Sequence, residues 1–259
     1  LTLSYDGQIV AGAAVKTAGV GIYGYFQAWK QDPSNTSVEP IGWSPHGDKL
    51  QGLNPYKWYN HHMSGDGNTI IWWSQDLTTI KIYKHNSGTN AWDEITHSFS
   101  IAYKGMRFRA NLSYDGSILV MGDMGYDTFK GRVQVYERDS SDQFTQIGSD
   151  FVGTTTGNEN SGSRMGSSIA INKNGDVFSF NEHISNAWKN YVYKRDGSGW
   201  SQMGDVSTEG ADGQHDMSLD DIGHSFAVST TSHQGQQQGK FYIFEYNTTD
   251  STWSHIINN

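Results

Sequence analysis

The chain reads Leu112-Ser113-Tyr114-Asp115-Gly116 and then Ile118-Leu119-Val120, a polar segment that ends in glycine and leads into an apolar run. Asp-Gly between apolar stretches is typical of a tight β-hairpin, because glycine readily adopts the positive φ that the turn requires. The arrangement returns four more times, with 48 to 60 residues between successive turn glycines, at Gly7, Gly67, Gly175 and Gly223. The chain therefore consists of five repeats of one β unit.

A second pattern follows each glycine turn. An alternating strand rich in Tyr, Phe and Val begins near Tyr25, Ile80, Arg132, Tyr191 and Phe241. A polar turn and a short closing strand come next, and the closing strands are expected at Val38–Gly42 and from Trp92, Phe144, Trp200 and Trp253. Each unit thus holds four strands, which we call a to d in chain order. Four-stranded units with a period near 50 residues are typical of propeller blades.

We therefore predict one all-β domain over residues 1–259, a five-bladed β-propeller with four antiparallel strands per blade. The predicted blades cover about residues 1–43, 56–97, 105–150, 163–205 and 213–259. A linear β-solenoid is the alternative fold, although its repeats are typically much shorter.

Several repeated or paired residues have a structural interpretation. Aromatic residues recur at matching positions of the third strands, so we expect them to pack between blades: Tyr83, Tyr136, Tyr193 and Phe244. Trp72 and Trp73 are adjacent on one strand and should point to opposite faces of the sheet. The same argument separates His61 from His62, so we expect no metal site there.

Composition excludes several classes of function. The net charge is −9 at pH 7 and no run of Lys or Arg could follow a phosphate backbone, so nucleic acid is not an expected partner. No apolar stretch approaches the roughly 20 residues of a membrane helix. Cysteine is absent, which removes disulfides and thiolate metal sites. No phosphate-binding loop, dinucleotide fingerprint or zinc motif occurs, and we expect no cofactor and no metal.

Two glycosylation sequons fall in predicted turn tips. They are Asn35-Thr36-Ser37 and Asn247-Thr248-Thr249. Since an acceptor there is accessible, we predict N-glycosylation at Asn35 and Asn247 and a secreted or cell-surface location.

Two segments carry a resemblance to known propeller repeats. The runs Ser161–Gly175 and Gly131–Gly148 are similar to the repeats of FG-GAP-like and WD40-like propellers. The resemblance implies a propeller that serves recognition of proteins or glycans. Neither the acidic calcium loop of integrin-type blades nor the Gly-His and Trp-Asp pair of WD40 repeats is present. The resemblance therefore assigns no functional residue.

The expected binding face carries the b–c loops and d–a connections, which are longer and more irregular than the a–b and c–d turns. Irregular loops on a rigid scaffold are where function concentrates. Aromatic rings that interrupt the repeat suit the apolar faces of sugars, and inner-strand polar residues line the channel. The predicted ligand-binding residues are Trp43, Trp58, Tyr59, Asn60, Arg107, Arg109, Trp188 and Asp216. The two arginines and Asp216 are candidates for an ion pair in the channel.

Function remains open between three hypotheses. The first is a non-catalytic propeller that binds a glycan or a partner protein through the long-loop face. The second is a five-bladed glycosidase whose acid and base or nucleophile come from Asp123, Glu182 and Asp216. The third is a structural module of a larger assembly, because Leu1 already lies within the first predicted strand.

Overall fold

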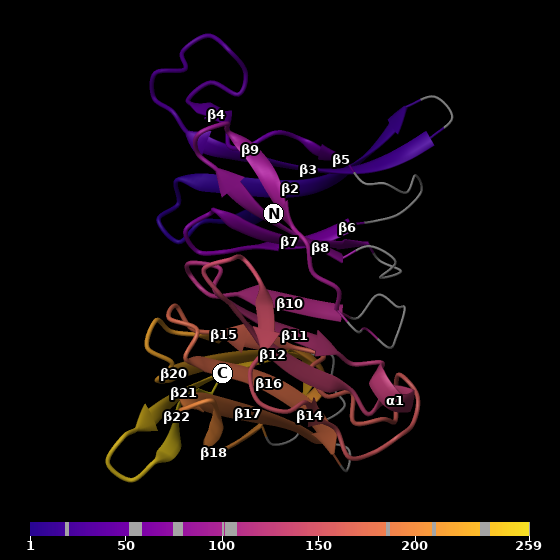
Figure 1. The fold of residues 1–259 in the computed structure, drawn as a ribbon. Helices are drawn as coiled ribbons and strands as arrows, with labels where there is room; N and C mark the ends of the chain where they lie inside the picture. The colour runs from indigo at the N-terminus through magenta and orange to yellow at the C-terminus, as the bar shows by residue number, and fades with distance from the viewer. Residues whose placement is uncertain are drawn as a thin grey trace.

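The computed structural model describes residues 1–18, 21–51, 59–74, 80–99, 101, 108–184, 187–208, 211–233 and 239–258. Within them lie five antiparallel sheets, each with four strands in chain order, and this confirms the predicted all-β five-bladed propeller. The sheets follow one another through the molecule, from sheet 1 at the top of Figure 1 to sheets 4 and 5, which overlap in the lower part of this view.

Each sheet is numbered here by its place in the chain. Sheet 1 contains β1 (Thr2–Leu3), β2 (Ile9–Ala18), β3 (Gly21–Gln31) and β4 (Trp43–Pro45), and β5 (Leu50–Gln51) also pairs with β3. Sheet 2 contains β6 (Tyr59–Met63), β7 (Thr69–Ser74), β8 (Ile80–Asn86) and β9 (Ala91–Ile95). Sheet 3 contains β10 (Phe108–Leu112), β11 (Ile118–Asp123), β12 (Arg132–Arg138) and β13 (Phe144–Gln146), and β14 (Phe151–Val152) also pairs with β12.

The last two sheets have four strands each. Sheet 4 contains β15 (Ile169–Ile171), β16 (Val177–Ile184), β17 (Ala187–Asp196) and β18 (Gly199–Thr208). Sheet 5 contains β19 (Ala211–Leu219), β20 (Ser225–His233), β21 (Lys240–Asn247) and β22 (Thr252–Asn258). A single helical turn, α1 (Tyr126–Phe129), lies between β11 and β12.

One predicted strand was misplaced. The closing strand of sheet 1 is Trp43–Pro45 rather than Val38–Gly42. Pro40 has no N–H to give to a ladder, and Gly42 adopts a φ of 81°, which is outside strand geometry. The segment before β4 therefore forms a turn, and the closing strand pairs with β3 only from Trp43 onward.

The a–b turns share one hydrogen-bond pattern that explains the repeated sequence. The turn glycines have φ values between 68° and 75°. The residue three positions before each glycine is Ser, Asn or Asp, and its side-chain oxygen accepts the N–H of the residue two positions after the glycine. The donor–acceptor pairs, at 2.8 to 3.0 Å, are Ile9–Ser4, Thr69–Ser64, Ile118–Ser113, Val177–Asn172 and Ser225–Asp220.

The core lies between successive sheets. Four clusters of buried apolar residues join sheets 1 and 2, 2 and 3, 3 and 4, and 4 and 5. Trp72 packs against sheet 1 and Trp73 against sheet 3, so the prediction that they face opposite ways is confirmed. The recurring third-strand aromatics also lie in these clusters, as expected: Tyr83, Tyr136, Tyr193 and Phe244.

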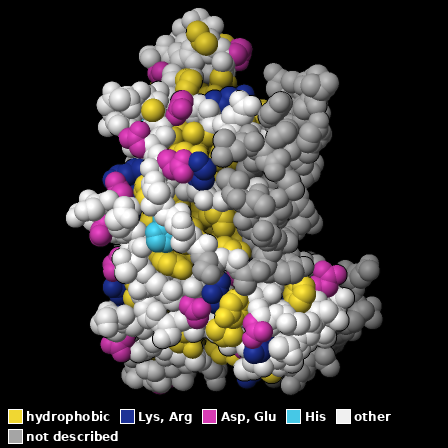
Figure 2. All heavy atoms as spheres, turned by 45° about the vertical axis from the view of Figure 1, so that its right-hand side comes forward, with side chains coloured by type: hydrophobic (Ala, Val, Ile, Leu, Met, Phe, Trp, Pro, Cys, Tyr) yellow, Lys and Arg dark blue, Asp and Glu magenta, His cyan; other side chains and the backbone are white. Residues whose placement is uncertain are grey.

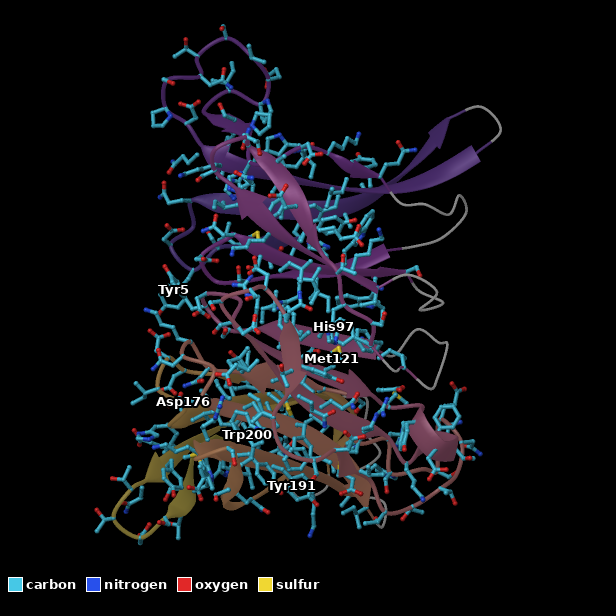
Figure 3. The ribbon with its side chains drawn as sticks, in the orientation of Figure 1. Tyr5, His97, Met121, Asp176, Tyr191 and Trp200 are labelled. Atoms are coloured by element: carbon cyan, nitrogen blue, oxygen red, sulfur yellow. The ribbon has the colours of Figure 1, made fainter. Side chains whose placement is uncertain are left out.

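The two rims of the propeller differ. Tyr5 and Asp176 belong to a–b turns and lie along the left edge in Figure 3, whereas α1 lies at the opposite edge in Figure 1. On the face shown in Figure 2, the described acidic and basic side chains are interspersed and form no patch of one sign. No helix in the described ranges is long and apolar enough to cross a membrane.

Candidate functional site

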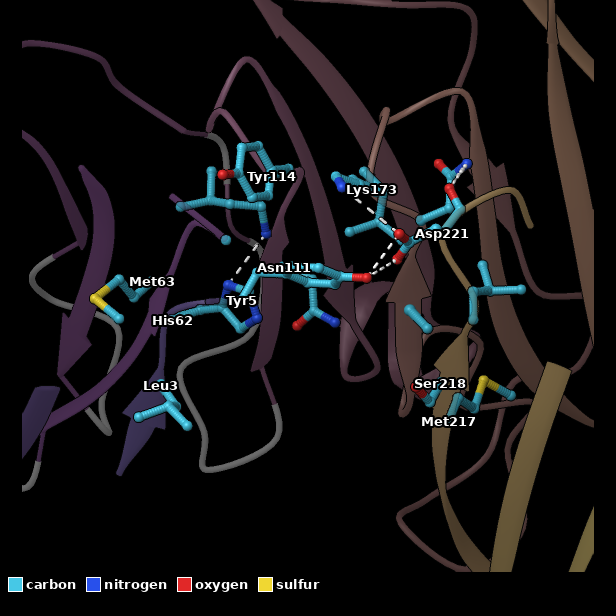
Figure 4. Close-up of a pocket in the computed structure, with 16 residues that line it drawn as sticks. Leu3, Tyr5, His62, Met63, Asn111, Tyr114, Lys173, Met217, Ser218 and Asp221 are labelled. Atoms are coloured by element: carbon cyan, nitrogen blue, oxygen red, sulfur yellow. Dashed lines mark hydrogen bonds and ion pairs between the residues drawn. The ribbon is translucent and has the colours of Figure 1, made fainter. Parts of the chain in front are cut away.

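A central pocket of about 430 Å³ lies where the inner strands of the five sheets approach one another (Figure 4). Every sheet contributes to its wall, from the last residues of its inner strand and from its a–b turn. Its volume lies within the range of about 300–1,000 Å³ that is common for small-molecule sites. The pocket therefore combines, in one place, side chains that are 48 to 60 residues apart in the sequence.

The floor of the pocket is an apolar ring. The residue four positions before each turn glycine lies there, so that all five sheets contribute one: Leu3, Met63, Leu112, Ile171 and Leu219. Met63 and Leu112 also belong to the buried clusters between sheets and Ile171 and Leu219 pack against such clusters, whereas Leu3 is 61% exposed. The floor is thus a continuation of the core towards the channel.

The mouth of the pocket is a polar and aromatic ring. The residue two positions before each turn glycine lines it, and these five positions hold four different residue types: Tyr5, Gly65, Tyr114, Lys173 and Asp221. Its neighbours in the turn are nearly constant because they build the hairpin. We call these five residues the mouth ring.

Charge and aromatic contacts connect the mouth ring. The Tyr5 hydroxyl donates to both carboxylate oxygens of Asp221, at 2.7 and 2.6 Å, across the pocket (Figure 4). The Lys173 ammonium lies 3.6 Å from Asp221 and 4.6 Å from the centre of the Tyr5 ring. Tyr5 meets Tyr114 edge to face at 5.9 Å. The hydrogen bond to Asp221, followed by desolvation and the negative charge of that carboxylate, raises the pKa of Tyr5.

His62 and Asn111 extend the polar lining below the mouth ring. His62 Nδ1 accepts the Leu112 N–H at 3.2 Å, which places the proton of the neutral imidazole on Nε2. Desolvation, with a smaller effect of His61, lowers the pKa of His62 to about 4, so the ring is neutral at pH 7. Asn111 Nδ2 donates to the Ile169 carbonyl at 3.1 Å and joins sheets 3 and 4 at the pocket wall. The site therefore offers fixed polar groups above an apolar floor.

The predicted aromatic platforms have different surroundings. Trp43 is half-buried in β4, on the rim of sheet 1. Trp188 is only 2% exposed and lies beneath the Arg164 guanidinium, at 4.7 Å from its ring centre. A ligand would have to displace Arg164 to stack on it. Trp58 lies outside the described residues, and so does the side chain of Tyr59.

The described members of the predicted channel set do not line the central pocket. Asn60 and Asp216 are exposed on the inner strands β6 and β19. Arg109 is half-buried and its Nη1 donates to the Phe108 carbonyl at 3.3 Å. In the described part of the chain Arg109 and Asp216 form no ion pair. Arg107, the other arginine of the expected pair, lies outside the described residues.

Two of the three candidate glycosidase carboxylates are buried and engaged. Asp123 is 4% exposed and lies 3.6 Å from the Arg132 guanidinium. Glu182 is 2% exposed and accepts the Thr154 N–H at 3.0 Å and the Tyr191 hydroxyl at 3.1 Å. Both therefore stabilise the rim between b–c loops and d–a connections. Among the described residues, no group of three or more His, Asp or Glu side chains is placed to hold a metal.

The two sequon asparagines also make structural contacts. Asn35 Nδ2, the atom that a glycan would join, donates to the carbonyls of Val38 at 2.8 Å and Trp43 at 2.6 Å. Asn247 lies on the exposed c–d turn of sheet 5, where its Nδ2 donates to Asp250 at 3.1 Å. Of the two, Asn247 is the more accessible acceptor.

Sequence reasoning missed the mouth ring. The a–b turns are short and regular, whereas the sequence pattern predicts binding at the irregular loops on the other rim. A usable signal was nonetheless present, since this position of the repeat varies among Tyr, Gly, Lys and Asp, whereas its two neighbours are mostly Ser and Asp. Variation inside an otherwise constant turn indicates that the fold does not determine that residue.

The comparisons with known proteins support the fold. No family model and no curated protein sequence matches the chain. Among solved structures, the periplasmic gluconolactonase PpgL of Pseudomonas aeruginosa is similar, with 12% identity and a TM-score of 0.58 over 99% of this chain and 70% of that chain. A functionally unknown protein of Desulfotomaculum acetoxidans is similar, with 13% identity and a TM-score of 0.57 over 100% of this chain and 71% of that chain. A Lactobacillus plantarum protein has 14% identity and a TM-score of 0.55 over 95% of this chain and 70% of its own.

These matches define the architecture. The chain has the β-propeller fold, and it is similar in structure to seven-bladed propellers of the lactonase type. The β-propeller fold that the resemblance implied is thus confirmed, and no family model matches the chain. At 12 to 14% identity the similarity concerns the path of the backbone alone.

Proposed function

We propose that this protein is a non-catalytic binding module that takes a saccharide in the central pocket. The observation that carries the proposal is the mouth ring, in which two tyrosine rings and a Lys173–Asp221 pair converge from different sheets. Sugars combine apolar C–H faces with hydroxyl groups, so they suit aromatic rings beside fixed donors and acceptors. The apolar floor and the polar mouth match that pattern.

The site differs from the face proposed from the sequence. The long-loop rim contains Trp58 and much of the longest connection, which lie outside the described residues. Within the described residues, Trp188, Asp123 and Glu182 of that rim are buried in structural contacts. The a–b turn rim instead offers a pocket with accessible polar groups, and this favours it as the place of binding.

A glycan array followed by calorimetry tests the proposal. We expect the parent protein to bind one class of mono- or oligosaccharide. Tyr114→Ala should weaken binding about tenfold, since a lost aromatic contact is worth roughly 0.5–1.5 kcal/mol. Asp221→Asn should have an effect of about the same size, because hydrogen bonds to charged groups contribute about 1.5–3 kcal/mol.

Asp142→Asn is the matched control. Asp142 forms an exposed ion pair with Lys84 at 3.0 Å, remote from the pocket, so its loss should leave affinity unchanged. Equal weakening by Asp221→Asn and Asp142→Asn would show a general charge effect, and silence across the whole array would remove the saccharide proposal.

The enzymatic alternative has its own assay. The periplasmic gluconolactonase that shares the fold gives the substrate to use, gluconolactone. We expect no turnover above the uncatalysed rate. Turnover that disappears in Asp221→Asn would make the pocket catalytic, and turnover that disappears in Glu182→Gln would favour the carboxylate mechanism predicted from the sequence.

A secreted or cell-surface location belongs to the same proposal, since saccharides of that size are abundant outside the cell. Its support is the accessible sequon at Asn247. Expression in a glycosylating host, with a mass shift lost in Asn247→Gln, tests it.

A further inference from the structure

The mouth ring holds an ammonium group, and that group belongs to the chain itself. Lys173 Nζ lies over the Tyr5 ring at 4.6 Å and over the Tyr114 ring at 5.2 Å from their centres. It also lies 3.6 Å from an Asp221 carboxylate oxygen, and this ion pair is drawn in Figure 4. Aromatic faces and a carboxylate both attract a cation, so together they form a site that suits an ammonium. We call Tyr5, Tyr114 and Asp221 the ammonium cage.

Lys173 fills the ammonium cage loosely. A hydrogen bond between an ammonium and a carboxylate usually spans about 2.7–2.9 Å, whereas Lys173 Nζ is 3.6 Å from Asp221. The side chains of Lys173 and Asp221 are 37% and 45% exposed. An exposed ion pair of this kind contributes little to stability, so little opposes the movement of the Lys173 ammonium into solvent.

The cage itself is held in place independently of the Lys173 side chain. Neighbouring a–b turns are joined by hydrogen bonds at 2.7 to 3.2 Å, three between backbone groups and one from the Asn172 side chain to a backbone carbonyl. The donor and acceptor residues are Tyr5–Gly65, Asp66–Tyr114, Tyr114–Lys173 and Asn172–Asp221. None of these bonds uses the Lys173 ammonium, so its departure leaves the turns where they are.

The turn glycines add to this rigidity. In sheets 2 to 5, a Cβ on the turn glycine would lie 2.4 to 2.5 Å from a side chain of the preceding sheet, so each of these turns rests directly on that sheet. The contacted residues are Ile9, Thr69, Ile118 and Val177. A site on turns that are already fixed binds a ligand without the cost of ordering them.

Asp221 can accept more hydrogen bonds than it receives from the Tyr5 hydroxyl. That hydroxyl donates to both carboxylate oxygens, at 2.7 and 2.6 Å, and so fixes the orientation of the group. An ionised carboxylate has about four lone-pair sites, which leaves acceptors for a second donor. An ammonium that is not tethered to Lys173 can therefore approach to hydrogen-bond distance.

The charges at the pocket favour a cation over an anion or a neutral group. Among the described residues that line it, Lys173 and Asp221 carry the formal charges at pH 7, since His62 is neutral. An anion would meet the negative ring faces and the Asp221 carboxylate, and a neutral group would gain nothing from them. A cation that replaces the Lys173 ammonium keeps the charge balance of the site. The net charge of −9 also favours its approach.

We propose that the central pocket selects saccharides that carry a free amine, and that the ligand's ammonium displaces Lys173 from the ammonium cage. The inference rests on the saccharide-binding function proposed above. The ligand's ammonium contacts both tyrosine rings and donates to Asp221, while its sugar ring extends over the apolar floor. The His62 Nε2–H is then a donor for a sugar oxygen.

Matched sugars test the proposal by calorimetry. The probes are trisaccharides of glucosamine and of galactosamine, each with free amines and in the fully N-acetylated form. At about pH 6.5 we expect one of the free-amine forms to bind at least about tenfold more tightly than its N-acetylated counterpart. Amines of this kind lose their proton near about pH 8, as α-amino groups do, so the preference should disappear at pH 9.

Lys173→Met separates displacement from direct contact. Removal of the competing ammonium should raise the affinity for the free-amine form about fivefold, while the Tm stays within about 2 °C of the parent. Lys84→Met is the matched control, because Lys84 forms an exposed ion pair with Asp142 at 3.0 Å outside the pocket, and it should leave the affinity unchanged. Weaker binding by Lys173→Met would make Lys173 a contact of the ligand and would overturn the displacement.

The outcomes distinguish this inference from the function on which it rests. Equal affinity for the two forms, or a preference for the N-acetylated form, overturns the selection of amines and leaves saccharide binding standing. A preference that persists at pH 9 also overturns it, since the amine is then uncharged. Silence towards all four trisaccharides, while the array shows another sugar bound, removes the inference alone. Silence across the whole array removes both.

Discussion

Gly131→Ala is expected to destabilise the protein by more than about 4 kcal/mol, the range of exceptional single substitutions. Gly131 precedes β12 with a φ of 79°, and a Cβ there would lie 2.2 Å from the Met165 nitrogen and 2.3 Å from the Met165 oxygen. These atoms belong to the backbone of the connection into sheet 4, which a rotamer change cannot move away. The substitution would therefore separate sheet 3 from that connection.

Gly197→Ala is the matched control for this prediction. Gly197 also has a positive φ, 59°, but nothing lies within 4 Å of its Cβ position. This substitution should lower the free energy of unfolding by only about 1–2 kcal/mol, which is the cost of alanine in a left-handed conformation. Urea unfolding of the two variants measures the difference, and similar losses would show that the close approach to Met165 contributes nothing.

Acidification from pH 7 to pH 4 is expected to remove stability on the order of 5 kcal/mol. Desolvation is the main cause that lowers the pKa of His46, His61 and His62, each to about 4, from the ordinary value of 6.5. His46 also stacks on His85 at 3.8 Å, and the electrostatic effect of that ring adds to the lowering of the His46 pKa. The native protein therefore keeps three neutral imidazoles.

The direction of the pH effect follows from proton binding. Between pH 6.5 and 4 the unfolded chain binds protons on these histidines while the native protein does not, so stability falls as the pH falls through that window. Asp6, Asp32 and Asp115 have lowered pKa values, and the stability that they add is lost only at more acidic pH. The two losses are thus separated along the pH scale.

Urea unfolding at pH 7.5, 6.0, 5.0 and 4.5 measures the effect. His62→Gln should flatten the dependence, since glutamine keeps an acceptor for the Leu112 N–H and does not titrate. His255→Gln, which changes an exposed histidine, should leave it as in the parent. A parent stability that is constant down to pH 4.5 would contradict the prediction.

The fold could be predicted from the sequence because the repeated residues form the same side-chain to backbone hydrogen bond in every a–b turn. The turn closes only with a side chain that accepts a hydrogen bond at Ser113 and with glycine at Gly116. The apolar run after them has to fill the space between sheets. Positions with such a double constraint recur in every unit, so their period identifies the blade. The closing strand of sheet 1 was predicted too early, at Val38–Gly42, although Trp43 supplies the aromatic residue that also marks the other closing strands.

The candidate site was much harder to predict. Tyr5, Lys173 and Asp221 are distant in the sequence and meet only because their turns converge on one axis. Asp123 and Glu182 were candidate acids because of their loop positions, but both are buried in structural contacts. Loop length was a poor guide, because it says nothing about which side chains the loop covers.

The way each turn glycine rests on the preceding sheet gives the molecule a direction of growth. A newly made sheet finds its support already formed by the sheet before it, through contacts such as Gly116 on Thr69 and Gly175 on Ile118. Nearest-neighbour packing of this kind lets a chain fold progressively as it leaves the ribosome. The sheets can thus form one after another in chain order, each packing on the sheet before it.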